Sequence, residues 1–228
     1  MTAVPLRQKA TPPMRREFAI SIDGPTASGK TSLAYALAAQ LDMRVLDTGL
    51  TFRAVAYAAS RGPLPPGRQL FEVLRHEPAM PGTRPVIPTV VYHRESIIDN
   101  LWSSEVEQHL RAVSADPAWR HDITEYHRTI VDGHERMIAV GRDCATTVMA
   151  DADCHIFLTA ADAIRRERRR AQHRAQPRRA VHVGPPTRLD DTIREHVACR
   201  PNGLVLDTTF LPAVAVLRAV VHHLGARR

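Results

Sequence analysis

The sequence is poor in aromatic residues, cysteine and long apolar runs. Aromatic residues make up 5% of its 228 positions, so a base-stacking platform for single-stranded nucleic acid would have few rings to use. No run of about 18 apolar residues is present, which excludes an ordinary transmembrane helix. The three cysteines lack CxxC spacing, which excludes a disulfide framework and suits a reducing compartment. Because residues 1–17 are basic but lack the apolar stretch of a secretory signal, we expect a cytoplasmic protein.

Lysine is also scarce. Lys9 and Lys30 are the only two lysines among 31 basic residues. A coding bias toward arginine would explain the ratio. A lysine kept at one position of the folded part nevertheless singles out Lys30, because a compact ammonium differs chemically from a guanidinium.

The formal net charge of +7 is concentrated in one segment. Residues 165–179 contain eight arginines and one glutamate, and the remainder of the chain is formally neutral. This segment could bind nucleic acid, in which case each arginine would add a salt-dependent phosphate contact. It could also be a solvated surface, or a local site for a smaller polyanion. We favour two or three functional arginines among solvated ones, and expect no nucleic-acid or membrane partner.

The hydrophobic pattern predicts a parallel α/β sheet. Phe18–Asp23 is apolar and rich in β-branched residues, as in a buried strand, and residues 32–41 have helical spacing. A second strand at 43–46 and a helix at about 51–60 follow, and this order opens a parallel α/β fold. Later strands are expected at 137–140, 155–158 and 204–206, with a closing helix at about 212–224.

The middle of the chain is less regular. Residues 61–88 contain seven of the 17 prolines, which predicts a loop or a poorly regular segment. This segment could begin an inserted subdomain. Short strands are expected at 90–92 and 96–98. Ser104 and Glu107 have the spacing of a capping box for a helix that ends near residue 115.

Two further helices have clear boundaries. Asp116-Pro117 is typical of a helix start, and Gly133 of a helix end. The arginine-rich segment is expected to be helical to about residue 175, and residues 177–186 to be irregular.

The segment GPTASGKT, residues 24–31, fits the pattern GxxxxGK[ST]. In that pattern the glycines let successive N–H groups face a phosphate, Lys30 reaches the β- and γ-phosphates, and the Thr31 hydroxyl ligates Mg²⁺. A plain glycine-rich turn is the alternative, and the pattern alone does not separate kinases from other P-loop NTPases. The candidate ATP-binding residues are Gly24, Pro25, Thr26, Ala27, Ser28, Gly29, Lys30, Thr31 and Ser32.

Single arginines follow two predicted strands. Arg53 lies one turn into the helix after the second strand, and Arg142 directly follows the third. Ligands of open α/β sheets sit beyond the carboxyl ends of strands, so both arginines can face the phosphate loop, beside Asp47 and Asp143. Positive charge around the moving phosphoryl group is what a phosphotransferase needs.

Four motifs resemble those of the bacterial cytidylate kinase family of P-loop nucleoside monophosphate kinases. IDGPTASGK is similar to that family's IDGPxGSGK, and LDTGLTFRAVAYAA to its LDTGAMYRAVALAA. VGRDCATTVMADADCHIFL resembles DGRDIGTVVFPDAxxKIFL, and Asp191 with Arg194 matches a DxxR element. The resemblance extends from about Phe18 to Leu224.

The resemblance implies a P-loop NTPase fold with three layers, α/β/α, around a parallel five-stranded sheet. It divides the chain into a flexible basic tail (1–17), a first core part (18–61), an inserted nucleoside-monophosphate subdomain (62–100) and a second core part (101–228). The second core part would carry an arginine-rich lid at about 165–190. A monomer is expected.

The resemblance also implies Mg²⁺-dependent transfer of the ATP γ-phosphoryl group to CMP or dCMP. Arg53 and Arg142 would grip the acceptor phosphate, Arg120 and Asp143 would face the base, and Asp191 would hold the sugar hydroxyls. The full acceptor set is Asp47, Thr48, Arg53, Arg111, Arg120, Arg142, Asp143, Asp191 and Arg194. The catalytic set is Lys30, Arg142, Arg165 and Arg169. The histidines lack HExxH spacing, and we expect no metal beyond the Mg²⁺ carried by ATP.

The sequence departs from the family mainly on the acceptor side. Val140 replaces an Asp, Phe52 a Tyr, Arg111 a small polar residue and Trp102 an Arg, and Arg188 stands one position from the arginine that opens RDxxDxxR. The acceptor could therefore be a modified pyrimidine nucleotide or another small molecule of specialised metabolism. A regulator that binds ATP without turnover is a further alternative.

Overall fold

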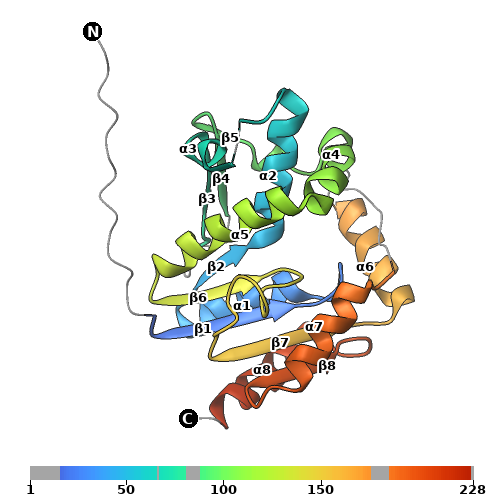
Figure 1. Cartoon of the computed structure of the whole chain (residues 1–228). Coiled ribbons are helices and arrows are strands. Elements are labelled where there is room, and N and C mark those ends of the chain that lie inside the picture. Colours follow the sequence, from blue (N-terminus) through green and yellow to red (C-terminus); the bar gives the residue numbers. More distant parts are fainter. Residues whose placement is uncertain (1–15, 66, 81–87, 176–184, 227–228) are drawn as a thin grey trace.

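The computed structural model describes residues 16–65, 67–80, 88–175 and 185–226. Five parallel strands form its central sheet in the order β2-β6-β1-β7-β8 (Figure 1). These strands are β1 (Phe18–Asp23), β2 (Arg44–Asp47), β6 (Arg136–Val140), β7 (Cys154–Thr159) and β8 (Gly203–Asp207). The predicted α/β class with a five-stranded parallel sheet is confirmed.

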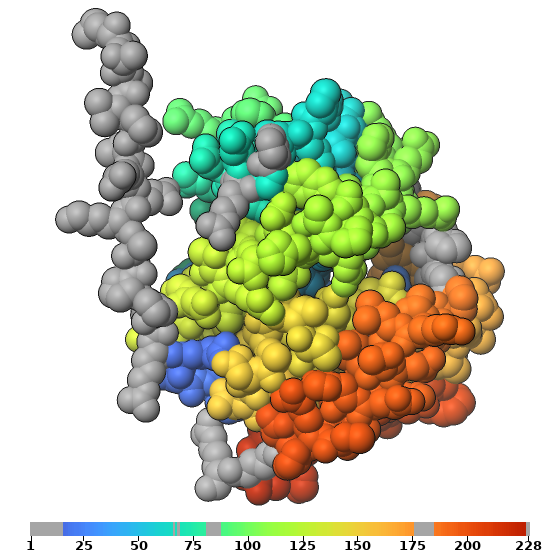
Figure 2. Space-filling model, in the orientation of Figure 1, coloured from blue at the N-terminus to red at the C-terminus, as the bar shows by residue number. Residues whose placement is uncertain are grey.

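Helices cover both faces of this sheet. On one face, α1 and α8 pack through Leu37 and Val220 against Ile20 and Ile156. On the other face, α5 contributes Val131 and α7 contributes Ile193. Figure 2 shows α5 in green and α7 in orange on that same side, with the yellow segment after β6 between them. The longer helices are α1 (Lys30–Leu41), α2 (Thr48–Arg61), α4 (Ser104–Ala115), α5 (Pro117–Asp132), α6 (Asp162–Ala175), α7 (Arg188–Ala198) and α8 (Ala213–Gly225).

A second, antiparallel sheet lies beside α2 and α4, above the central sheet in Figure 1. Its core includes Leu74, Val90 and Leu101 together with Val55 of α2 and Val106 of α4. Its elements are η1 (Gly67–Gln69), α3 (Leu70–Val73), β3 (Leu74–Glu77), β4 (Thr89–Tyr92), β5 (Glu95–Ser96) and η2 (Ile98–Asn100).

Two predictions for this region were wrong. Residues 61–88 were expected to be a loop or a poorly regular segment, but they contain a short helix and β3, which pairs with β4. In β3 the buried Leu74 and His76 alternate with exposed Arg75 and Glu77, a pattern too short to stand out among prolines. The strand expected at 96–98 ends at Ser96, because the buried Ile97 turns the chain into η2.

Helix caps explain where α2, α4 and α5 begin. Asp47 caps α2, since its Oδ1 accepts from the Gly49 N–H at 3.1 Å, and the helix starts three residues earlier than expected. Ser103, and not the predicted Ser104, caps α4, because its extended backbone lets Oγ accept from the Val106 N–H at 3.3 Å. The predicted start of α5 at Asp116 is confirmed, with bonds of 2.8 and 3.3 Å from the N–H groups of residues 118 and 119.

Parts of the expected tail and lid lie outside the described residues, namely 1–15 and 176–184. Of the basic cluster, Arg178 and Arg179 fall there. Within the described segments, no helix has both the length and the apolar character needed to cross a membrane.

Candidate active site

The loop between β1 and α1 has the tight curl that a phosphate-binding loop requires. Gly24 has φ +137°, and a Cβ there would lie 2.0 Å from the carbonyl oxygen of Leu158, so only glycine fits. Gly29 has φ +101° and Ala27 has φ +64°. No side chain caps α1, and its first turn holds no acidic residue. The positive end of this helix is therefore left for an anion.

Lys30 opens α1 and folds back over the loop. Its Nζ donates to the carbonyl oxygen of Pro25 at 2.7 Å. Burial lowers the pKa of Lys30 to about 8, while the carboxylates of Asp47 and Asp23 oppose that shift. The ammonium thus lies among groups that keep it charged, at the end of a helix suited to phosphate.

Thr31 and Asp47 place two hard oxygens beside the loop. The Thr31 hydroxyl donates to Asp47 Oδ2 at 3.3 Å. Burial raises the pKa of Asp47, and Lys30 opposes that effect. A hydroxyl and a carboxylate suit Mg²⁺, which binds few protein groups and completes its shell with water and phosphate oxygens. Among the described residues, no group of three or more His, Cys, Asp or Glu forms a separate metal centre.

The turn after β6 forms the second wall of the site. Arg142 Nη2 donates to Asp190 Oδ2 at 2.5 Å and to the Thr187 hydroxyl at 3.1 Å. Burial alone would raise the pKa of Asp190, but hydrogen bonds from Thr187 and Arg142 outweigh it, and the pKa is lowered. Asp143 pairs with Arg120 of α5, and the Arg120 guanidinium lies 6.0 Å from the Phe52 ring. The structure therefore brings Arg120 and Asp143 into contact with each other.

Of three other acceptor candidates, two form hydrogen bonds within the protein and one is exposed to solvent. Arg53 donates to Glu107 at 2.7 Å and to the Leu101 carbonyl oxygen at 3.1 Å. Thr48 is buried, and its hydroxyl donates to the Val140 carbonyl oxygen at 3.1 Å, which anchors α2 to β6. Arg111 lies exposed on α4.

The two residues of the DxxR element pair with each other. Asp191 and Arg194 form an exposed ion pair with N···O 3.5 Å, on the outer side of α7. Asp190 is only 2% exposed and contacts Arg142 instead. Sequence reasoning missed Asp190. Because Ile193 and Val197 are also buried, the helical period that places them in the core could have placed Asp190 on the same side.

Some arginines of α6 contact other parts of the protein, and the others are exposed to solvent. Arg165 is 1% exposed and donates to the Thr26 carbonyl oxygen at 3.1 Å. Arg168 donates to Thr208 at 2.9 Å, and the Thr208 hydroxyl donates to the Ser28 carbonyl oxygen at 3.0 Å. Arg169 is 6% exposed and approaches Trp102. The exposed members of the cluster are Arg166, Arg170 and Arg174.

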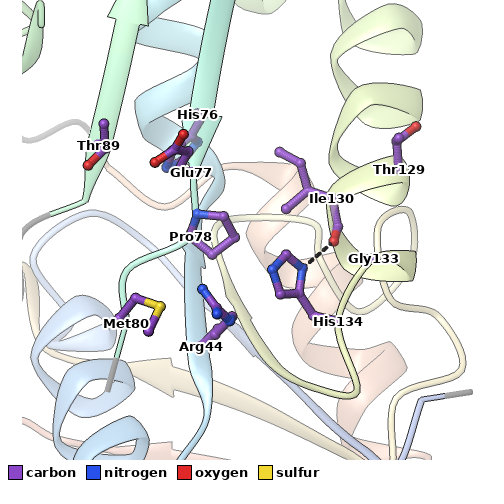
Figure 3. Close-up of a pocket in the computed structure, with 10 residues that line it drawn as sticks. All are labelled: Arg44, His76, Glu77, Pro78, Met80, Thr89, Thr129, Ile130, Gly133 and His134. Atoms are coloured by element: carbon purple, nitrogen blue, oxygen red, sulfur yellow. Dashed lines mark hydrogen bonds between the residues drawn. The ribbon is translucent and has the colours of Figure 1, made fainter. Parts of the chain in front are cut away.

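A separate cavity of about 500 Å³ lies between the start of β2, the end of β3 and the end of α5 (Figure 3). Arg44, Glu77 and His134 line it, and His134 Nδ1 is bonded to the Ile130 carbonyl oxygen at 2.8 Å. None of the residues 24–31 lines this cavity, so it is distinct from the loop site.

Comparisons with known proteins identify the family of this chain. The sequence profile of the family described as cytidylate kinase matches residues 20–183. The cytidylate kinase of Streptomyces griseus subsp. griseus is 32% identical over 220 residues, covering 94% of this chain and 95% of the relative. That of Streptomyces coelicolor is 34% identical over 208 residues, covering 89% and 90%. Among solved structures, a shikimate kinase from Bacteroides thetaiotaomicron superposes with TM-score 0.45 at 12% identity, covering 91% of this chain and 98% of the other. The family match and the relatives that span nearly the whole chain show that this protein belongs to the cytidylate kinase family.

Proposed function

We propose that this protein transfers the γ-phosphoryl group of ATP to the phosphate of CMP or dCMP, giving the nucleoside diphosphate and ADP. The observation that carries the proposal is one cluster of cations and dipoles at the carboxyl ends of β1 and β6. It contains the loop 24–31 with Lys30, and the turn that presents Arg142 beside Asp143. Relatives named cytidylate kinase support the acceptor.

In this proposal the donor side is built by residues 24–32. The N–H groups of the loop and the start of α1 hold the phosphate chain of ATP, and Lys30 exchanges the Pro25 carbonyl for a phosphate oxygen. Thr31, with Asp47, would hold Mg²⁺. When bound, that ion neutralises charge on the phosphates. Arg165 holds the loop in its conformation by donating a hydrogen bond to the Thr26 carbonyl oxygen.

The acceptor side uses Arg142 and Arg53 for the acceptor phosphate. Arg142 exchanges part of its contact with Asp190 for the phosphate, and Asp190 keeps the guanidinium aimed at the site. Arg120 and Asp143 recognise the base as a donor and acceptor pair. Little covalent chemistry is asked of the protein, so positioned positive charge supplies most of the rate enhancement.

A kinase of a modified pyrimidine nucleotide is the second candidate. Asp191 and Arg194, which match the sugar-binding DxxR element, are exposed and pair with each other. Val140 is 1% exposed at the end of β6 and provides no carboxylate. These departures lie on the acceptor side, whereas the donor loop is complete.

A coupled assay of ADP release tests both candidates, with ATP, Mg²⁺ and a panel of nucleoside monophosphates, nucleosides and base-modified CMP analogues. Turnover of CMP or dCMP that exceeds all other acceptors supports the main proposal, and preference for a modified base supports the second. Lys30→Ala should abolish turnover with any acceptor. ATP binding by calorimetry without turnover of any acceptor would instead indicate a regulator.

A further inference from the structure

Trp102 lies between two arginines from distant parts of the chain. The Arg53 guanidinium, on α2, is 4.2 Å from the centre of the indole ring, and the Arg169 guanidinium, on α6, is 5.9 Å from it. Both distances fall within the range of cation–π attraction, which is strongest for tryptophan. Trp102 itself stands in the turn between η2 and α4. One ring therefore joins the acceptor side of the site to the arginine-rich helix.

Both arginines are largely withdrawn from water. The Arg53 side chain is 11% exposed and Arg169 is 6% exposed. Two buried like charges repel each other and lose hydration. Glu107 neutralises part of the charge of Arg53, and the π face of Trp102 attracts both guanidinium groups. The ring thus holds the two guanidinium groups near each other, although their like charges repel.

Arg53 retains donors for a ligand in this arrangement. Its two hydrogen bonds, to Leu101 and Glu107, both use Nη1. Among the described residues, Nε and Nη2 of Arg53 have no hydrogen-bond partner. A bound anion would draw Arg53 and Arg169 together and would offset their repulsion.

We propose that Trp102 is a positioning residue that couples acceptor binding to ATP binding, by holding Arg53 and Arg169 on one ring. The inference rests on the proposed function, in which Arg53 meets the acceptor phosphate and Arg169 belongs to the helix that braces the ATP loop. Arg169 already lies against the ring in this structure, so ATP bound at the loop that α6 contacts would strengthen that contact and keep Arg53 presented to the acceptor. Thermodynamic linkage requires the converse effect to be equal, so the acceptor should tighten ATP binding by the same factor.

Calorimetric titration measures this coupling without turnover. CMP is titrated into the protein alone and into the protein saturated with a non-hydrolysable ATP analogue and Mg²⁺. In the wild type the analogue should tighten CMP binding about fivefold or more. Trp102→Ala should reduce that factor to near one while the affinity for the analogue alone is kept. Trp102→Phe, which retains a weaker aromatic face, should keep part of it. Trp119→Phe, on α5, is the matched control and should preserve the wild-type factor. Equal coupling in the wild type and in Trp102→Ala would overturn the inference.

Fluorescence separates failure of this inference from failure of the proposed function. The chain has two tryptophans, so Trp119→Phe leaves Trp102 as the sole tryptophan, which can be excited selectively over the tyrosines. Binding of the ATP analogue alone should change its emission, and Arg169→Ala should remove that change. If the wild type binds the analogue but not CMP, the proposed acceptor is wrong, and the emission change still decides whether α6 acts on Trp102. Calorimetric binding of the analogue without any change in emission contradicts the role of Trp102.

Discussion

The Asp23 carboxylate accepts a hydrogen bond from the backbone N–H of Cys144 at 2.7 Å. It also accepts from the next N–H, that of Ala145, at 2.8 Å. Asp23 ends β1 directly before the phosphate loop, and Cys144 follows the turn that carries Arg142 and Asp143. Burial raises the pKa of Asp23 to about 7, although the two N–H groups oppose that shift. This residue therefore fixes the donor loop against the acceptor turn.

Replacing Asp23 by alanine should lower kcat/KM by about tenfold or more, because Arg142 loses its fixed distance from the loop. Asp153→Ala is the control. Its carboxylate accepts from the Ala19 N–H at 2.7 Å, at the other end of β1. Both variants should lose stability of about 1–2 kcal/mol, as measured by urea unfolding. If Asp153→Ala reduced kcat/KM as strongly, the effect would be one of stability alone.

Ala27 should be a source of strain that glycine relieves. Its φ of +64° lies in the left-handed region, which costs a non-glycine residue about 1–2 kcal/mol, while glycine adds backbone entropy to the unfolded state. Ala27→Gly should therefore raise the free energy of unfolding by about 0.5–1 kcal/mol. Ala39→Gly, at an exposed position of α1, should lower it by about 1 kcal/mol. Denaturant midpoints of the two variants should move in opposite directions.

Arg165 and Arg166 are adjacent but should behave differently. Arg165 is buried against Thr26, whereas Arg166 is exposed. Arg165→Ala should lower kcat/KM for ATP by about 10²-fold, because the loop carbonyl that it holds becomes free to move. Steady-state rates measured well below the unfolding temperature test this. Arg166→Ala should remain near the wild-type rate, and equal losses in both variants would argue for a diffuse effect of net charge.

Two buried histidines should make the protein sensitive to acid. Burial lowers the pKa of His76 to about 4 and that of His127 to about 3, from 6.5. Between pH 6.5 and these values the unfolded chain binds more protons than the folded one, so the free energy of unfolding falls as the pH falls. For His127 alone the loss at about pH 5 is roughly 2 kcal/mol.

His127→Leu should accordingly lose less stability than the wild type between about pH 7.5 and about pH 5 in urea unfolding. His121→Gln is the matched control, because His121 lies exposed on the same helix and its removal should leave the pH dependence unchanged. An identical slope in His127→Leu and the wild type would show that His127 takes up its proton equally in the folded and unfolded states, which contradicts a lowered pKa.

Local signals in the sequence were sufficient to predict the phosphate loop and the order of the central elements. The glycines at positions 24 and 29 are needed for backbone reasons that hold in any context, and both have positive φ. Asp116 and Gly133 likewise act on neighbours a few residues away. The family motifs placed Arg120 and Asp143 in one role, and the structure joins them.

Only the tertiary structure decided which face of each element meets the site. α7 turns Asp190 inward and Asp191 outward, because the packing of Ile193 and Val197 sets the rotation of the helix. Trp102 meets Arg169 across 67 residues of sequence, and no local pattern encodes that contact. The scarcity of lysine and aromatic residues also became clearer: Lys30 lies in the phosphate loop, and one of the two tryptophans contacts two arginines. A sequence by itself determines short-range geometry, whereas the direction of a side chain depends on everything packed behind it.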